Sequence, residues 1–378
     1  MAKKIKVGLA GTRAQSIIQG LRADPDVEIA AICDLNEDTL NHMADAYNIP
    51  HRYRVFEDMA DSDLDAIHIA TPMQCHVPQA LYALEAGKHV MSEVTAGVTM
   101  DELFWLCEAV ERSGKIYMYA ENYCYTPEVQ LVKSLVDRGM FGDPYYAVGM
   151  YLHNCSELIE YPNGKSSWRK YWQFGKRGNF YPTHSLGPVM TWLENERIRE
   201  IATFAPAGCY NDRGVRQDDG TTTMCYTDSG KVVQIRVDCT SNRPHDATHY
   251  HLQGTKGAYQ AAGALSSGPA IAIRTEEDPN GDQHWRPLFD FAEYLPDRYK
   301  IATDSEKNAG HGGGDFFIVD DFIQSIRENK EPYYNVYKAC EWTAVGLLSE
   351  LSLTNGSRMI EIPNFRKGMP REEQIIKI

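Results

Sequence analysis

The stretch 178–188, G-N-F-Y-P-T-H-S-L-G-P, places Tyr181 and His184 together at the predicted start of a helix. An imidazole exchanges protons near neutral pH, so His184 is a candidate general acid or base. The structural alternative is an ordinary histidine in a helix start that Thr183 caps. The elements around this stretch bear on the choice between the two interpretations.

The first third of the chain alternates β-branched runs with amphipathic segments of helical length. Parallel strands need a crossover between them, so this alternation predicts a doubly wound Rossmann-type sheet. The predicted strands are Ile5–Ala10, Val27–Cys33, Ala66–Ala70, His89–Glu93 and Ile116–Glu121, and the predicted helices are Ala14–Ala23, Glu37–Tyr47, His76–Ala86 and Met100–Ser113.

Such sheets bind ligands beyond the carboxyl ends of their strands, so the residues that follow each strand are candidate cofactor ligands. The run G-T-R-A-Q-S at 11–16 keeps only the first glycine of G-x-G-x-x-G, and Arg13 could compensate by charge. Asp34 follows the second strand, where a carboxylate would bind the adenosine ribose and repel a 2′-phosphate, which favours NAD over NADP. An exposed arginine and a helix-capping aspartate are the structural alternatives. The candidates at the strand ends are Gly11, Thr12, Arg13, Asp34, Thr71, Pro72, Glu93, Val94, Glu121 and Asn122.

After Glu121 the pattern changes to the period of two that is typical of antiparallel strands, as in V-V-Q-I-R-V-D-C at 232–239. We therefore predict an α/β protein with a Rossmann domain over 1–122 and an α+β domain with a largely antiparallel open sheet over 123–378. Two late helices, Asp315–Arg327 and Val336–Leu353, are expected to pack back on the first domain.

Composition limits the classes of partner. The 378 residues carry a net charge of −14, which argues against nucleic acid and anionic membranes as partners. The nine cysteines include no C-x-x-C pair, and His245, His249 and His251 lack a completing ligand, so we expect no metal site. The first residues, M-A-K-K-I-K, do not resemble a signal peptide, and no apolar run is long enough to span a bilayer, which favours a cytoplasmic protein.

The order of these parts resembles the Gfo/Idh/MocA-type oxidoreductases over essentially the whole chain. The motifs that carry this resemblance are I-H-I-A-T-P at 67–72, His76, A-G-K-H-V at 86–90 and Glu93. Within that family the chain looks most like the NAD-dependent glycosidases typified by α-N-acetylgalactosaminidases. The closer match lies in E-V-T-A at 93–96, G-N-F-Y-P-T-H-S-L-G-P at 178–188, G-T-K-G at 254–257 and G-H-G-G-G-D at 310–315.

One position separates the two branches of that family. Dehydrogenase members usually carry the lysine of an E-K-P motif where this chain has Val94, which cannot exchange a proton. Valine at this position is similar to the glycosidase branch, although Thr95 departs from the proline common beside it. Another side chain must then accept the proton of the substrate hydroxyl.

The resemblance implies catalytic roles for Glu121, Tyr151, His153 and His184. Tyr151 and His153 are two residues apart in a strand, so both side chains face one side. We predict Tyr151 as the base at sugar carbon 2 and His184 as the proton acceptor near carbon 3, an assignment that could be exchanged. The resemblance also implies cofactor contacts for His76, Trp168 and Arg169 and substrate contacts for Tyr181, His311 and Asp315.

The resemblance implies a glycosidase that binds NAD and acts through transient oxidation at sugar carbon 3, elimination, water addition and re-reduction. One alternative is a sugar or inositol 3-dehydrogenase, and another is a non-catalytic regulator that responds to NAD or sugar. The expected partner is a small carbohydrate or glycoside, and we expect the chain to form a homo-oligomer.

Overall fold

The computed structural model describes residues 4–206 and 214–371. These residues divide into two compact units, which are described separately. Unit 1 comprises residues 4–125, 303–340 and 365–369, and unit 2 comprises residues 126–206, 214–302, 341–364 and 370–371.

Unit 1 is built on a six-stranded sheet in which every neighbouring pair is parallel. The strand order is β3-β2-β1-β4-β5-β6, so the chain starts in the middle and winds outward in both directions. Its central strands are buried almost completely, which explains their continuous apolar runs. The strands are β1 (Ile5–Ala10), β2 (Val27–Cys33), β3 (His51–Tyr53), β4 (Ala66–Ile69), β5 (His89–Ser92) and β6 (Tyr117–Tyr119).

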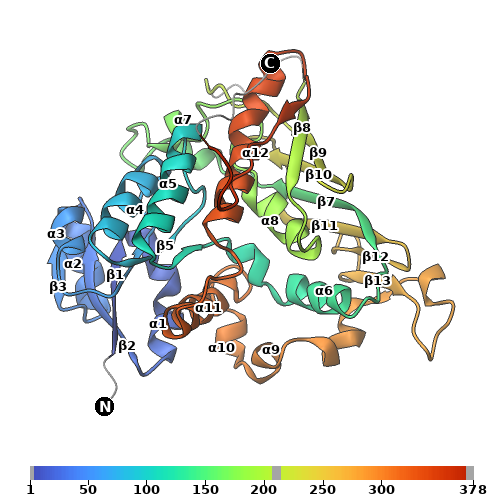
Figure 1. The fold of residues 1–378 in the computed structure, drawn as a ribbon, viewed down its shortest axis with the longest axis horizontal. Coiled ribbons are helices and arrows are strands. Elements are labelled where there is room, and N and C mark those ends of the chain that lie inside the picture. Colours follow the sequence, from blue (N-terminus) through green and yellow to red (C-terminus); the bar gives the residue numbers. More distant parts are fainter. Residues whose placement is uncertain (1–3, 207–213, 372–378) are drawn as a thin grey trace. The chain divides into compact units, whose positions relative to one another are not determined.

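The helices of unit 1 connect these strands, and α4 and α5 lie side by side in Figure 1. The longest connecting helix, α5, starts with a reciprocal capping box between Thr99 and Glu102 and ends at Gly114 in the left-handed conformation. Late in the chain, α11 returns to pack on α1. The helices are α1 (Ile18–Ala23), α2 (Glu37–Ala46), α3 (Phe56–Ala60), α4 (His76–Glu85), α5 (Met100–Ser113), α10 (Asp304–Lys307) and α11 (Gly314–Glu328).

Unit 2 contains a nine-stranded sheet of order β14-β13-β12-β11-β7-β10-β9-β8-β15. Only β7 and β10 run parallel, and all other neighbours are antiparallel, so the predicted fold class is confirmed. The strands are β7 (Pro144–Leu152), β8 (Ile198–Phe204), β9 (Thr221–Thr227), β10 (Val232–Asp238), β11 (Asp246–Gly254), β12 (Gly257–Gln260), β13 (Ala270–Ile273), β14 (Arg286–Pro287) and β15 (Ile360–Glu361).

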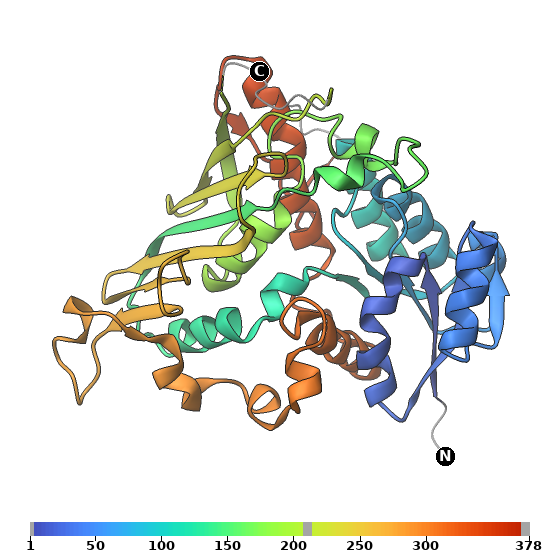
Figure 2. The same ribbon diagram turned by 180° about the vertical axis from the view of Figure 1, so that it is seen from behind.

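The helix α8 (Thr183–Trp192) packs on one face of this sheet, against β7, β10 and β11. All ten of its residues are buried, which agrees with its nearly uniform apolar character. Gly149 of β7 allows the close approach, because a Cβ there would lie 1.9 Å from the Ser185 carbonyl oxygen. Figure 2 shows no helix over the opposite face among the described residues. The other helices here are α6 (Pro127–Asp137), α7 (Arg169–Trp172), α9 (Asp297–Ile301) and α12 (Val336–Thr354), which begins in unit 1.

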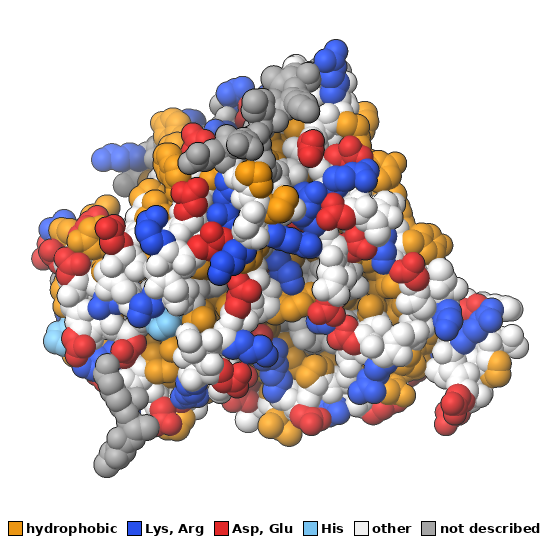
Figure 3. Space-filling model, in the orientation of Figure 1, with side chains coloured by type: hydrophobic (Ala, Val, Ile, Leu, Met, Phe, Trp, Pro, Cys, Tyr) orange, Lys and Arg blue, Asp and Glu red, His pale blue; other side chains and the backbone are white. Residues whose placement is uncertain are grey.

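The surface mixes charges of both signs. On the face shown in Figure 3, acidic and basic side chains are interspersed among polar and apolar ones. No helix within the described ranges combines the length and the apolar character that crossing a membrane requires.

Candidate active site

The predicted cofactor residues lie at one edge of the unit 1 sheet, because the carboxyl ends of parallel strands meet there. Gly11 follows β1, Asp34 follows β2, Thr71 follows β4, Glu93 follows β5 and Glu121 follows β6. Since β2, β1, β4, β5 and β6 are neighbours in that order, the sheet arranges the five positions in a row.

The turn after β1 fits a dinucleotide despite its reduced glycine motif. Gly11 has a φ of +84°, and a Cβ there would lie 2.5 Å from the Ala70 carbonyl oxygen, so only glycine suits this position. The Asp34 carboxylate accepts hydrogen bonds from the backbone N–H groups of Thr12 (3.1 Å) and Asn36 (2.8 Å). Because Asn36 is the cap of α2, the alternative of Asp34 as that cap is wrong.

Glu93 follows β5 and lies beside a buried histidine. Its Oε1 is 3.9 Å from Nε2 of His68, a β4 residue with no exposed side-chain surface. Burial raises the pKa of Glu93 to about 7 against the opposing attraction of Arg13. Burial lowers the pKa of His68 to about 3, so this imidazole is neutral at physiological pH. Glu93 therefore titrates near neutrality, as catalytic and ligand-binding carboxyls often do.

His311, Asp315 and Asn122 form a bonded group in unit 1. His311 Nδ1 lies 2.9 Å from Asp315 Oδ2, and Asn122 donates to Asp315 Oδ1 at 2.6 Å. Burial opposes both charges, yet the hydrogen bond between the pair raises the pKa of His311 and lowers that of Asp315. Both shifts favour the charged forms of the pair. We call Arg13, Glu93, Glu121, His311 and Asp315 the carboxylate cluster.

His76 connects two loops at this edge of the sheet. Its two ring nitrogens lie 2.7 Å from the Thr95 carbonyl oxygen and 2.8 Å from the Thr71 carbonyl oxygen. The ring thus links the segment after β4 to the segment that carries Val94, whose peptide bond to Thr95 is cis. The cofactor contact predicted for His76 would act through the loops that it holds.

In unit 2 the structure brings the predicted catalytic rings together. The centroid of the Tyr151 ring lies 5.0 Å from that of His184, 5.4 Å from that of His153 and 6.0 Å from that of Tyr181. Tyr181 and His184 are also in edge contact, at 5.1 Å. Tyr151 and His184 are buried, at 8% and 6% exposed. His184 lies in the first turn of α8, so the predicted helix start is confirmed.

The sequence reasoning missed one member of this group. His245 was considered only as a metal ligand, but its ring lies 3.9 Å from that of His153, in an edge-to-face contact. His245 is exposed and Tyr151 is buried, so the rings run from the interior to solvent. No spacing in the sequence could pair residues 153 and 245, since the sheet alone brings their strands together. We call Tyr151, His153, Tyr181, His184 and His245 the ring cluster.

Trp168 and Arg169, predicted to touch the cofactor, lie at the start of α7 in unit 2. The Arg169 guanidinium lies 4.4 Å from the centre of the Trp168 ring, and its Nη1 donates to Gln173 at 2.6 Å. Both side chains are half-buried, so part of each surface is available to a ligand.

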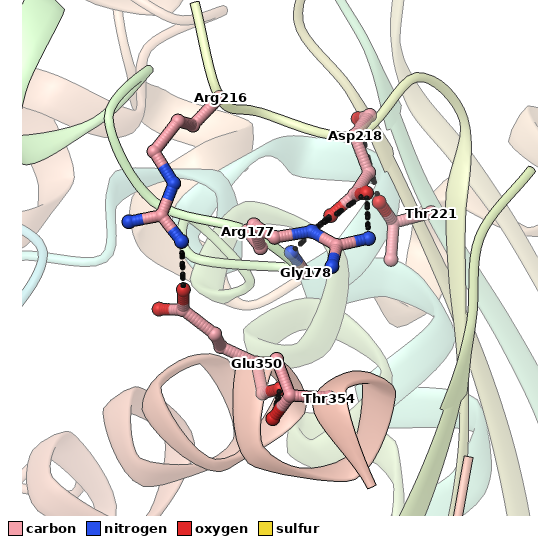
Figure 4. Close-up of polar contacts among 7 residues, drawn as sticks. All are labelled: Arg177, Gly178, Arg216, Asp218, Thr221, Glu350 and Thr354. Carbon is pink, nitrogen blue, oxygen red and sulfur yellow. Dashed lines mark hydrogen bonds and ion pairs between the residues drawn. The ribbon is translucent and has the colours of Figure 1, made fainter. Parts of the chain in front are cut away.

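The loop that carries Tyr181 and His184 is anchored by a carboxylate (Figure 4). Arg177 donates from Nε and Nη2 to Asp218, at 3.1 and 2.7 Å, and the Gly178 N–H donates to the same carboxylate at 2.9 Å. The next residue, Asn179, donates from its backbone N–H to Ser349 at 2.8 Å. These contacts fix the chain just before the ring cluster.

Metal ligands do not gather in the described ranges: no group of three or more His, Cys, Asp or Glu side chains there could hold an ion. Eight cysteines are free thiols, seven of them buried, and Cys209 lies outside the described residues.

Comparison with protein families assigns both parts of the chain. Residues 5–121 match the oxidoreductase family with an NAD-binding Rossmann fold, and residues 211–371 match the C-terminal domain of glycosyl hydrolase 109. A glycosyl hydrolase family 109 protein of Saccharopolyspora erythraea is 31% identical, over 96% of this chain and 84% of the relative. The chain belongs to glycosyl hydrolase family 109. The predicted resemblance is thereby confirmed.

Other relatives of this family 109 chain differ in their names. A protein of Shewanella oneidensis named α-N-acetylgalactosaminidase is 28% identical, over 96% of this chain and 85% of its own length. Among solved structures, the WlbA dehydrogenase from Bordetella pertussis in complex with NADH and UDP-GlcNAcA has a TM-score of 0.74. It is 19% identical and covers 96% of this chain and 99% of its own, a likeness of fold alone.

NAD is the cofactor of this family's Rossmann domain, as predicted. The turn at Gly11 and the carboxylate of Asp34 fit the diphosphate and the adenosine ribose, respectively, and the Asp34 charge disfavours a 2′-phosphate.

Proposed function

We propose that this chain is an NAD-dependent glycosidase that acts on a small carbohydrate or glycoside through a transient 3-keto sugar. The observation that carries the proposal is the ring cluster, which supplies several proton-exchanging side chains in a chain that has Val94 where dehydrogenases have lysine. The Shewanella oneidensis relative's name supports an N-acetylgalactosaminide as the substrate.

Gly11, Thr12 and Asp34 would hold NAD, which when bound would accept a hydride and later return it. His184 takes the proton of the carbon 3 hydroxyl as that carbon is oxidised to a ketone. The ketone makes the carbon 2 hydrogen acidic, and Tyr151 removes it as a proton while the bond from carbon 1 to the glycosidic oxygen breaks.

The remaining steps restore the sugar and the protein. The proton that Tyr151 removed passes through His153 and His245 to solvent, and the leaving oxygen takes one proton from solvent in its place. Water adds its oxygen and one hydrogen to carbon 1 and its other hydrogen to carbon 2. The hydride removed at the start returns to carbon 3, and His184 gives its proton back to the hydroxyl. Tyr181, in edge contact with His184, holds a sugar hydroxyl. The contacts expected of Glu121, His311 and Asp315 remain predictions.

The test offers a panel of aryl glycosides in deuterated water with a trace of NAD. Aglycone release, NADH accumulation and deuterium at sugar carbon 2 are followed together. We expect release with deuterium incorporation and no lasting NADH, and we expect His184→Gln to remove all three signals. Stoichiometric NADH without release would identify a dehydrogenase and overturn the proposal, and silence in every channel would favour a regulator.

The expected cytoplasmic location and homo-oligomer remain predictions. Gel filtration with light scattering would measure the oligomeric state, and fractionation of the native cells would locate the protein.

A further inference from the structure

A hollow lies in unit 2, away from the ring cluster. It has a volume of about 280 Å³ and lies where β11, β12 and β13 meet the loop after β13, which projects beyond the sheet in Figure 1. His245 immediately precedes β11 and Gln253 lies near its end, eight residues on, which at about 3.3 Å per residue places the two sites about 25 Å apart. One sugar ring therefore cannot occupy both.

The lining combines small residues of the strands with one large aromatic side chain. Gly257 and Ala272 are among the small residues, and a Cβ on Gly257 would lie 2.4 Å from Ile273, so no larger side chain fits there. Trp285 lines the wall with 54% of its surface exposed. An exposed indole presents a flat apolar surface, here beside polar side chains of the same lining.

The loop that presents Trp285 is braced internally. Arg274 pairs with Asp282 at 2.8 Å, and His284 pairs with Asp278 at 3.0 Å. Arg286, beside Trp285, donates to the Ile273 carbonyl oxygen at 2.8 Å. These bonds fix the loop on either side of Trp285 before any ligand binds, which lowers the entropic cost of ordering it.

The polar side chains that line the hollow include both hydrogen-bond donors and acceptors, and the charge of its lysine balances that of its aspartate. Lys256 lines the hollow and offers its ammonium group as a donor. Asp282 Oδ1 is buried and accepts no hydrogen bond within the described chain. Gln253 donates its amide N–H groups to the Gly254 and Gly257 carbonyl oxygens, so its Oε1 can accept a hydrogen bond from a ligand.

We propose that this hollow, at Trp285, Asp282, Lys256 and Gln253, is a non-catalytic subsite for a neutral pyranose. A pyranose has an apolar C–H face that suits the indole and hydroxyls that both donate and accept. The Asp282 carboxylate disfavours an anion, and Lys256 disfavours a cation. The volume is close to the lower limit of about 300 Å³ for ligand pockets, which suits a single ring. The choice of ligand class rests on the proposed glycosidase function.

The test uses the full-length, NAD-loaded protein labelled with 5-fluorotryptophan, because ¹⁹F NMR then reports each indole separately. Trp105 is the matched control, since it is also 54% exposed but lies in α5 of unit 1. Trp285→Phe and Trp105→Phe assign the two resonances. The probes are free galactose, N-acetylgalactosamine and glucose, with adenosine as a planar aromatic comparison.

We expect at least one sugar to shift the Trp285 resonance saturably, at millimolar affinity, while the Trp105 resonance stays in place. Asp282→Asn should weaken that binding by up to about tenfold, because the charged acceptor is replaced by a neutral amide oxygen. The inference is overturned if no sugar moves the Trp285 resonance at tens of millimolar, if both resonances move alike, or if only adenosine acts.

Glycosidase assays on the same preparations separate this inference from the proposed function. Trp285→Phe should leave the turnover of small aryl glycosides unchanged. A saturable Trp285 response in a protein without glycosidase activity supports the sugar subsite and overturns the proposed function. Glycosidase activity without a Trp285 response supports the proposed function and overturns the subsite.

Discussion

The carboxylate cluster of unit 1 and the ring cluster of unit 2 differ in how their residues are tuned for chemistry. In the carboxylate cluster of unit 1, burial and neighbouring charges change the proton affinity of Glu93, His311 and Asp315. In the ring cluster of unit 2, buried Tyr151 and His184 lie in a group of packed rings. Because of this difference, we expect substitutions in unit 1 to change cofactor affinity and the pH dependence of stability. Substitutions in the ring cluster are expected to change turnover.

The largest expected effect is in the ring cluster. Tyr151→Phe removes the phenol that we assign as the base at carbon 2 and keeps the packed ring, so kcat should fall about 10²- to 10⁴-fold. NAD affinity, measured by calorimetry, should not change. Tyr226→Phe, on the 39% exposed side chain of β9, is the matched control and should leave both values intact. A parallel loss of NAD affinity in Tyr151→Phe would contradict the distinction between the carboxylate cluster and the ring cluster.

The next effect belongs to cofactor recognition in unit 1. Asp34→Asn removes the charge that favours the ribose diol and opposes a 2′-phosphate, so NAD should bind about 10- to 100-fold more weakly. The preference for NAD over NADP should shrink with it, as competition binding of the two cofactors would measure. Asp38→Asn, on the exposed first turn of α2, supplies the control. Equal NAD affinity in the wild type and Asp34→Asn would withdraw the assignment.

A pH-dependent effect is expected at Glu93. Its pKa rises from 4.5 to about 7 on folding, so the folded protein binds more protons than the unfolded chain between these values. Stability is therefore lost as the pH rises through this window, by at most about 3 kcal/mol. Glu93→Gln should stabilise the cofactor-free protein above pH 7 and change little below pH 4.5.

Urea denaturation at a series of pH values measures this difference. Glu37→Gln, on an exposed carboxylate of α2, should give curves parallel to the wild type. A Glu93→Gln curve that is also parallel to the wild type would show that the buried carboxyl is not protonated on folding.

The smallest effect is expected where the ring cluster is held in place. Asp218→Asn weakens the paired bonds to Arg177 and the bond to the Gly178 N–H, and partly exposed Arg177 can turn to solvent, so stability should fall by about 1 kcal/mol. As a positioning residue, Asp218 should affect kcat by less than tenfold and leave KM unchanged. Asp228→Asn breaks a similar pair with Arg197 that does not touch this loop. A kcat loss as large in Asp228→Asn would refute the positioning role.

Much of the fold could be predicted because its signal is local. The bounds of β1, β2 and α5 agree with those read from hydrophobic periodicity and caps. The strand β3 was missed, since three residues are too few to show a period. The hairpin around Trp285 was not predicted, because its bracing pairs form between loop residues that carry no repeating pattern.

The residues of the candidate site also divide into those with a local sequence signal and those without one. Glu93, Asp34, Tyr181 and His184 could be found because each lies in a motif or follows a strand. The contact between His153 and His245 could not, because it depends on how β7 and β11 pair.

The sequence by itself determined the two kinds of sheet, the glycine turn with its following aspartate, and the motifs of the glycosidase branch, because all of these are encoded in short stretches. Tertiary structure alone decided the bond from Asn122 to Asp315, the cluster of five rings and the hollow beside Trp285. Each of these joins residues far apart in the chain, and their proximity follows from strand order and packing rather than from any local pattern.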